Sequence, residues 1–172
     1  RLRKICSQIN GKLKIFKNPQ AIVASQQPQK KDNKEIYNKV TNSIKTPKQM
    51  NVAMIVDEFT YNSFCYECNA LPLEPHNWRE VFEKNDIDLF FCESAWSGTD
   101  SKRRPWKGQI YSSIRFAKEN RGILLEILNY CRERGIPTAF WNKEDPTHYD
   151  DKVHNFVDTA LKFDHIFTTS IE

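Results

Sequence analysis

The stretch NVAMIV, residues 51–56, is a run of β-prone residues bounded by Asn51 and Asp57. Because it lacks the alternation of a half-exposed strand, it predicts a strand that is buried on both faces. Three similar apolar runs follow it, and they are IDLFFCE (87–93), IPTAFW (136–141) and HIFTT (165–169). The sequence therefore predicts four strands.

Segments with helical spacing separate these strands. They are HNWREVFEKN (76–85), NRGILLEILNYCRERG (120–135) and VHNFVDTALKF (153–163). The second is expected to end at Gly135, after Arg132 and Arg134, because basic residues and a glycine are typical of helix C-termini. Buried strands that alternate with amphipathic helices predict an α/β fold, a Rossmann-like parallel sheet with helices on both faces.

The charge distribution divides the 172 residues into two parts. Residues 1–50 hold twelve Lys or Arg against Asp32 and Glu35, a net charge of +10, whereas residues 51–172 hold fourteen against twenty acids, a net −6. We expect residues 1–50 to be a basic extension or linker, partly helical near residues 34–44 or disordered. This extension is a candidate for peripheral membrane contact. The acidic part lacks a basic groove, so we expect no specific nucleic-acid partner.

The five cysteines form no disulfide framework, which is typical of a reduced, cytoplasmic protein. No apolar run approaches the roughly 20 residues of a membrane span. Cys65 and Cys68 form a CxxC pair, which leaves a thiol-redox role as a weak alternative. The four histidines lie on different predicted elements without an HExxH motif, so the sequence predicts no metal site. Motifs of dinucleotide, nucleoside-triphosphate and serine-hydrolase sites are also missing.

The loops that follow the four strands are rich in carboxylates, aromatic rings and hydroxyl groups. They are DEFTYNSF (57–64), ESAWSGTDSKRRPWKG (93–108), NKEDPTHYDD (142–151) and TSIE (169–172). In open α/β sheets ligands bind beyond the carboxyl ends of the strands, so we expect these loops to form a site. Taken singly, each residue also has a structural explanation: Asp57 or Glu58 as a helix cap, Asp145 in a turn before Pro146.

Several stretches together resemble a known family. MIVDEFTYNSF, DLFFCESAWSGTD, the NRGILLEILNYCRERGIPTAFWNKEDPTHYDD run and FVDTALKFDHIFTT are similar to the N-terminal half of bacterial glycosyltransferases of the spore-maturation CgeB type. The resemblance runs in order through residues 51–170. It implies one Rossmann-like half of a two-domain GT-B architecture, working on cell-envelope or spore glycans in the bacterial cytoplasm or at the inner face of the membrane.

The resemblance implies an acceptor-side domain. The partners expected from it are a glycan or polymer acceptor and a C-terminal donor-binding domain of the same enzyme, which would hold the nucleotide sugar. This chain is expected to hold no cofactor and to be inactive alone. The general base is expected to be Glu93 or Asp145. The expected substrate-binding residues are Asp57, Glu58, Phe59, Tyr61, Ser94, Trp96, Trp141, Asn142, Lys143, Glu144 and His148.

Two alternatives stay open on the residues alone. The chain is either part of a transferase or a non-catalytic module that binds carbohydrate or a partner protein. The segment SGTDSKRRPWKGQI (97–110) is either a mobile lid, with its four basic residues around Trp106, or an ordinary exposed loop.

Overall fold

The computed structural model describes residues 45–144, 147–148 and 151–169. The chain divides into two compact units, residues 1–49 and 50–172. In the first, the described residues contain a short 3₁₀ helix, η2 (Pro47–Gln49). The helix expected near residues 34–44 lies outside the described residues.

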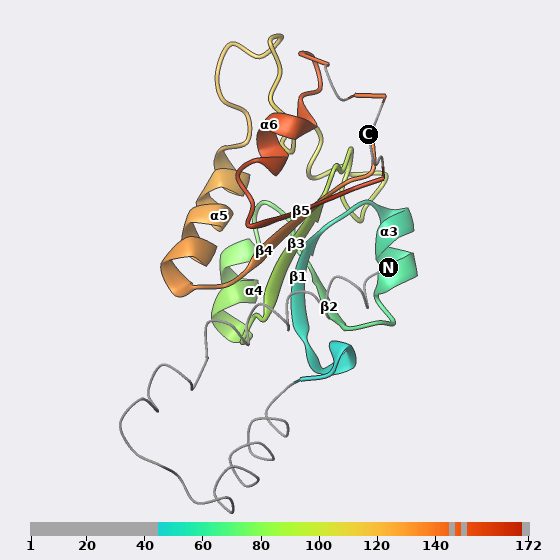
Figure 1. Ribbon diagram of the computed structural model, residues 1–172, viewed down its shortest axis with the longest axis vertical. Coiled ribbons are helices and arrows are strands. Elements are labelled where there is room, and N and C mark those ends of the chain that lie inside the picture. Colours follow the sequence, from blue (N-terminus) through green and yellow to red (C-terminus); the bar gives the residue numbers. More distant parts are fainter. Residues whose placement is uncertain (1–44, 145–146, 149–150, 170–172) are drawn as a thin grey trace, which may run out of the picture. The chain divides into compact units, whose positions relative to one another are not determined.

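The second unit is an α/β domain built on a five-stranded sheet (Figure 1). The strands are β1 (Asn51–Ile55), β2 (Asn69–Pro72), β3 (Leu89–Glu93), β4 (Thr138–Asn142) and β5 (His165–Thr168), in the order β2-β1-β3-β4-β5. All four pairings are parallel, and the register places Ile55 opposite Cys92 and Glu93 opposite Trp141. The predicted Rossmann-like α/β fold is therefore confirmed.

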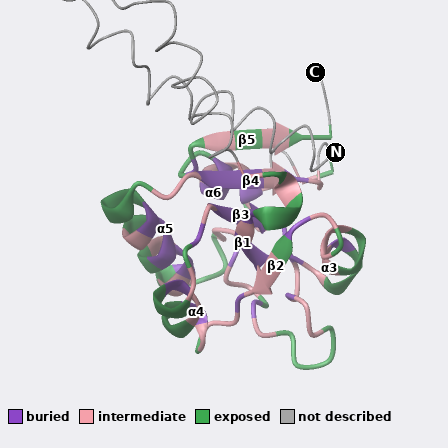
Figure 2. Ribbon diagram, turned by 90° about the horizontal axis from the view of Figure 1, so that it is seen from below, coloured by how far each residue is buried: buried purple, intermediate pink, exposed green. Residues whose placement is uncertain are grey.

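Helices cover both faces of the sheet, as Figure 2 shows from below. The helices are α3 (Glu58–Phe64), α4 (Trp78–Lys84), α5 (Gly122–Arg134) and α6 (Phe156–Ala160). Side chains of α4, α5 and α6 form one core with sheet residues such as Phe90 and Phe140. On the opposite face, Phe64 of α3 lies with its ring centroid 6.2 Å from that of Phe91.

Two elements differ from the sequence expectation. β2 is a fifth strand, and the loop expected after β1 contains the helix α3. The strand NALP has four residues and pairs only with β1, at the edge of the sheet, where Pro72 is tolerated. So short a segment carries neither the apolar run nor the alternation by which a strand is predicted.

The helix expected over residues 120–135 is present as α5. It buries Leu124, Ile127, Leu128 and Cys131, and it ends at Gly135 with φ +65°. The N–H of Ile136 donates to the carbonyl of Cys131 at 2.9 Å, which closes the C-terminus as expected for a left-handed glycine.

The helix expected over residues 153–163 is shorter at both ends, because α6 begins only at Phe156 and ends at Ala160. The backbone of Asn155 pairs instead with Ser112 in an isolated antiparallel bridge. Its N–H donates to the Ser112 carbonyl at 2.9 Å, so this residue is held in an extended segment rather than a helical turn. The side chain of Asn155 then caps α6 by accepting from the N–H of Asp158.

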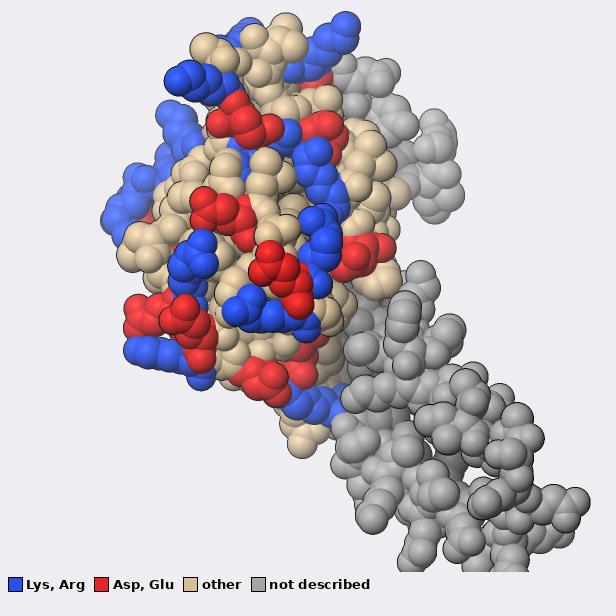
Figure 3. All heavy atoms as spheres, turned by 90° about the vertical axis from the view of Figure 1, so that its left-hand side faces the viewer, with Lys and Arg blue, Asp and Glu red and all other residues tan. Residues whose placement is uncertain are grey.

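The face over α4 and α5 carries acidic and basic side chains side by side (Figure 3). Pairs such as Lys84 with Glu80 at 2.6 Å and Arg79 with Glu126 at 3.2 Å account for part of this mixture. Among the described residues, no helix has the length and apolar character that crossing a bilayer requires.

Candidate functional site

The carboxyl ends of β1, β3 and β4 bring three charged residues together. Asp57 comes two residues after β1, Glu93 ends β3, and Lys143 follows β4 directly. The chain leaves β1 toward β2 on one side and returns to β3 on the other, so the order reverses between β1 and β3. This topological switch point is where open α/β sheets bind ligands.

The three side chains form one network. Lys143 Nζ lies 2.8 Å from Glu93 Oε1 and 3.5 Å from Asp57 Oδ2. Glu93 Oε1 also accepts a 2.6 Å hydrogen bond from the backbone N–H of Asp57. The Glu93 side chain is 0% exposed, whereas those of Lys143 and Asp57 are 22% and 18% exposed. Solvent therefore reaches the cation and Asp57 but not Glu93.

The pKa values within this network shift in a way that keeps Lys143 charged. Burial raises the pKa of Glu93. The charge and hydrogen bond of Lys143 lower this pKa, as do hydrogen bonds from Thr60 and the Asp57 backbone, but together they offset only part of the effect of burial. Burial by itself lowers the pKa of Lys143. The attraction and hydrogen bond of Glu93, with the charges of Asp57 and Glu144, outweigh burial and raise that pKa.

Asp57 does not cap its own helix. It occupies the N-cap position of α3, yet its side chain makes no cap hydrogen bond there. Its two oxygens instead accept from three successive backbone N–H groups after β3: Trp96 at 3.0 Å, Ser97 at 2.8 Å and Gly98 at 2.9 Å. One carboxylate thus holds the start of the segment 97–110 against the sheet edge.

The segment 97–110 is anchored at its far end as well. Trp106 is fully buried, and its indole N–H donates to the Leu73 carbonyl at 2.7 Å. Arg103 pairs with Glu74 and Asp100, each at 2.6 Å, although Arg103 itself is 62% exposed. In this conformation the segment is a loop pinned by an aromatic anchor, with Lys102, Arg103 and Arg104 exposed at its tip.

Trp96 connects this network to a second cluster. Its ring centroid lies 5.3 Å from that of His148, 5.2 Å from His154 and 5.1 Å from Phe156. Asp151 Oδ2 lies within hydrogen-bonding distance of both imidazoles, 3.2 Å from His148 Nδ1 and 2.8 Å from His154 Nδ1. Among these residues the sequence interpretation had assigned only His148 and Trp96 to the site. The regular spacing of His148, Asp151 and His154, three residues apart, was the signal available for the others.

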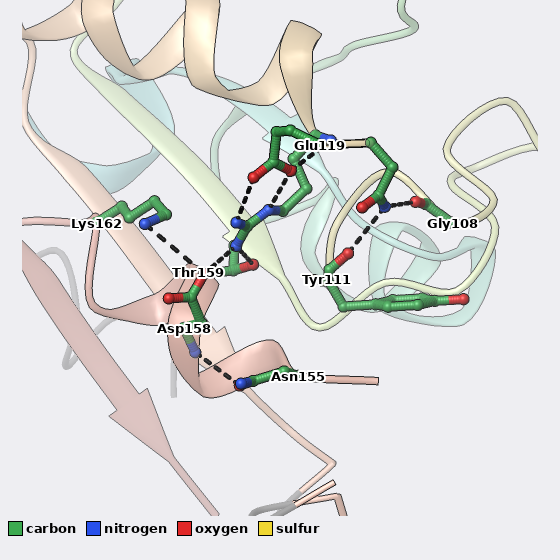
Figure 4. Close-up of polar contacts among 9 residues, drawn as sticks. Gly108, Tyr111, Glu119, Asn155, Asp158, Thr159 and Lys162 are labelled. Atoms are coloured by element: carbon green, nitrogen blue, oxygen red, sulfur yellow. Dashed lines mark hydrogen bonds and ion pairs between the residues drawn. The ribbon is translucent and has the colours of Figure 1, made fainter. Parts of the chain in front are cut away.

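A buried arginine, Arg121, fixes the segments that border this cluster. Figure 4 labels its partners Glu119, Asp158 and Thr159. The Arg121 side chain is 4% exposed and pairs with Glu119 at 2.8 Å and with Asp158 of α6 at 2.6 Å. It also donates to the Thr159 hydroxyl at 2.9 Å. The neighbouring Asn120 donates to the carbonyls of Gly108 and Tyr111. These bonds tie α6, the start of α5 and the long β3–α5 loop into one unit.

Not all of the predicted site residues converge. Ser94 belongs to the network, since its hydroxyl accepts from the Lys143 N–H at 3.0 Å. Asn142, at the end of β4, is buried, and Glu144 follows Lys143. Asp145 lies outside the described residues.

The remaining predicted residues belong to α3 or face it. Glu58 and Phe59 are exposed on the first turn of α3, with Phe59 82% exposed. Burial and the nearby Cys65 and Cys68 raise the pKa of Tyr61, which places it near the cysteine pair. Trp141 packs against Phe64, 5.8 Å between centroids.

Two other features lie apart from the network. Cys65 and Cys68 are free thiols, and Cys68 is buried. A pocket of about 500 Å³ opens near the amino-terminal ends of β3 and β4, where α4 and α5 end. Its lining includes Tyr130, Arg134 and Pro137.

Comparisons with protein-family models, with curated proteins and with solved structures gave no match to this chain.

Proposed function

We propose that residues 51–172 are the acceptor-side domain of a glycosyltransferase that moves a sugar from a nucleotide sugar to a glycan, polymer or protein acceptor. The observation that carries the proposal is the Asp57–Glu93–Lys143 network at the β1–β3 switch point. It supplies a fixed, partly exposed cation at the edge where such a sheet binds ligands. The resemblance of the loops to CgeB-type enzymes supports the same function.

In the proposed reaction an acceptor hydroxyl attacks the anomeric carbon while the bond to the nucleotide phosphate breaks. Where the anomeric configuration is inverted, a base must take the hydroxyl proton, and it has to reach the substrate to do so. Glu93 is fully buried and bonded to Lys143, so we assign it a positioning role. Within this proposal Asp145, two residues after Lys143, is the base.

Lys143 and Trp96 are then the acceptor-binding groups. The ammonium group is held in place by two carboxylates and donates to acceptor oxygens, and the half-buried Trp96 indole offers an apolar surface for a sugar ring. The donor sugar is assigned to a separate domain of the same enzyme, as the resemblance implies.

The test is ligand-observed NMR of this chain with a panel of glycan acceptors and nucleotide sugars. We expect acceptor affinity to fall at least about tenfold, roughly 1.4 kcal/mol, in Lys143→Met/Glu93→Gln, a double variant that leaves no unpaired charge at the buried Glu93 position, and in Lys143→Met if its NMR spectrum shows that it is folded. The exposed Lys152→Met serves as the matched control. Tight binding of nucleotide sugars with no acceptor binding would show that the donor half had been assigned wrongly.

A second candidate is a non-catalytic module that binds a carbohydrate or a partner protein. It is favoured by Phe59 and Tyr66, which are 82% and 80% exposed at the start of α3 and just after its end. If acceptor binding survives in Lys143→Met but is lost in the double variant Phe59→Ala/Tyr66→Ala, the binding module is the better description.

A further inference from the structure

The second cluster, His148, Asp151 and His154, has the composition and convergence of a metal site. One ligand atom from each residue lies within 4.8 Å of the other two. The Nδ1 atoms of both imidazoles face the same oxygen, Asp151 Oδ2, at 3.2 Å and 2.8 Å. Tetrahedral ligands about 2.0–2.2 Å from a metal ion are separated from one another by about 3.3–3.6 Å, so the 3.2 Å distance is close to that of a coordination sphere, and the 2.8 Å distance requires a small outward movement of His154.

The local structure holds the three residues in place. Asp151 Oδ1 accepts a 2.7 Å bond from the Val153 N–H, which fixes the carboxylate and leaves Oδ2 toward the imidazoles. The carbonyl of Lys152 accepts from Ile114 at 3.1 Å, and the following Asn155 bridges to Ser112. These backbone bonds attach residues 152–155, which include His154, to the β3–α5 loop.

Imidazole nitrogens and carboxylate oxygens are both ordinary metal ligands. A neutral imidazole carries one proton, on either ring nitrogen. With the proton on Nε2, both Nδ1 lone pairs point toward the space that Oδ2 borders.

We propose that His148, Asp151 and His154 bind a divalent transition-metal ion of the Zn²⁺ type. Two imidazoles and one carboxylate suit zinc and its first-row neighbours, whereas Mg²⁺ and Ca²⁺ prefer oxygen ligands alone. Three protein ligands leave a coordination position for water or a substrate oxygen. The three side chains are 24%, 27% and 31% exposed, so an ion has access from solvent.

Aromatic rings enclose the inner side of this site. The ring centroids of Trp96 and Tyr111 lie 5.2 Å and 5.1 Å from that of His154, and Phe156 packs 5.1 Å from both. This packing limits the rotation of the His154 imidazole. Because the Trp96 N–H is bound to Asp57, the metal site borders the Asp57–Glu93–Lys143 network. The proposal does not depend on the transferase activity.

The test begins with the whole chain freed of metal by a chelator and titrated with Zn²⁺ by calorimetry. We expect one ion per chain with a dissociation constant at or below about 1 μM, and negligible heat with Mg²⁺. His154→Ala and Asp151→Asn should each weaken Zn²⁺ binding at least about tenfold. The controls are His76→Ala and Cys65→Ser/Cys68→Ser, which alter a distant imidazole and the thiol pair and should leave the affinity unchanged.

A second measurement does not depend on variants. ¹⁵N NMR of the imidazoles should show Zn²⁺ shifting the Nδ1 resonances of His148 and His154, while those of His76 and His165 stay in place. The proposal is overturned if Zn²⁺ fails to bind, if binding survives in Asp151→Asn and His154→Ala, or if only the cysteine variant loses it.

Discussion

The ammonium group of Lys143 lies 2.8 Å from a carboxylate, Glu93, that has no exposed surface. Nothing but the protein can then compensate the Glu93 charge, and Lys143 is the only full positive charge bonded to it among the described residues. Removing one member of a buried pair is costlier than removing both, since it leaves a charge that neither water nor a counter-ion stabilises.

This pair predicts a strong energetic coupling. Lys143→Met should lower the free energy of unfolding by about 3–5 kcal/mol, because Glu93 stays buried without its cation. The double variant Lys143→Met/Glu93→Gln should be more stable than the sum of the single effects by about 1–3 kcal/mol. Urea denaturation of the four proteins measures this coupling, with Lys152→Met as the exposed control. Additive effects within about 0.5 kcal/mol would contradict it.

Arg121 is predicted to stabilise the junction between α6 and the β3–α5 loop. Arg121→Ala should lower the free energy of unfolding by about 2–3 kcal/mol, since four side-chain bonds are lost while Glu119 and Asp158, at 44% and 43% exposed, regain water. The exposed Arg115→Ala should change it by less than about 0.5 kcal/mol. Equal effects of the two substitutions, measured by denaturant unfolding, would refute a structural role of Arg121.

The same cluster predicts an acid-sensitive contribution to stability. The Arg121 side-chain bond, followed by further bonds and the guanidinium charge, holds the pKa of Glu119 at about 2, below its ordinary value of about 4.3. A carboxyl group whose pKa is lower in the folded state stabilises that state at pH values above its pKa in the unfolded chain. That stabilisation is lost as the pH falls toward 2. Glu119→Gln should therefore flatten the decrease in unfolding free energy between about pH 5 and pH 2.

This pH dependence has an internal check. In an Arg121→Met background, Glu119→Gln should no longer alter the slope, because the partner that depresses the pKa is gone. A slope that changes equally in both backgrounds would assign the effect to other carboxylates.

Two glycines are predicted to respond oppositely to alanine. Gly98 has φ +93°, and a Cβ there would lie 2.8 Å from Cδ1 of the buried Trp106. Gly98→Ala should lower the thermal midpoint, at a cost of about 1–3 kcal/mol. Gly122 begins α5 with nothing within 4 Å of a Cβ, so Gly122→Ala should be neutral or stabilise by up to about 1 kcal/mol. Calorimetric scans of both variants compare the two sites directly.

The apolar pattern alone was enough to predict β1, β3, β4, β5 and α5, including the end of α5 at Gly135. Burial on both faces of a central strand leaves a continuous apolar run, and a helix leaves a stripe, so both are visible locally. The sequence also placed Asp57, Glu93 and Lys143 in loops that follow parallel strands, but it offered only Glu144 or Asp145 as ion-pair partners of Lys143.

Only the tertiary structure decided how those residues are used. Asp57 has the sequence position of a helix cap, yet it binds N–H groups about 40 residues away. The burial of Glu93 and the convergence of Asp151 with two histidines likewise depend on loops packed from distant segments. Periodicity in a sequence reports which face of an element is buried, whereas contacts between loops depend on how the assembled chain positions them.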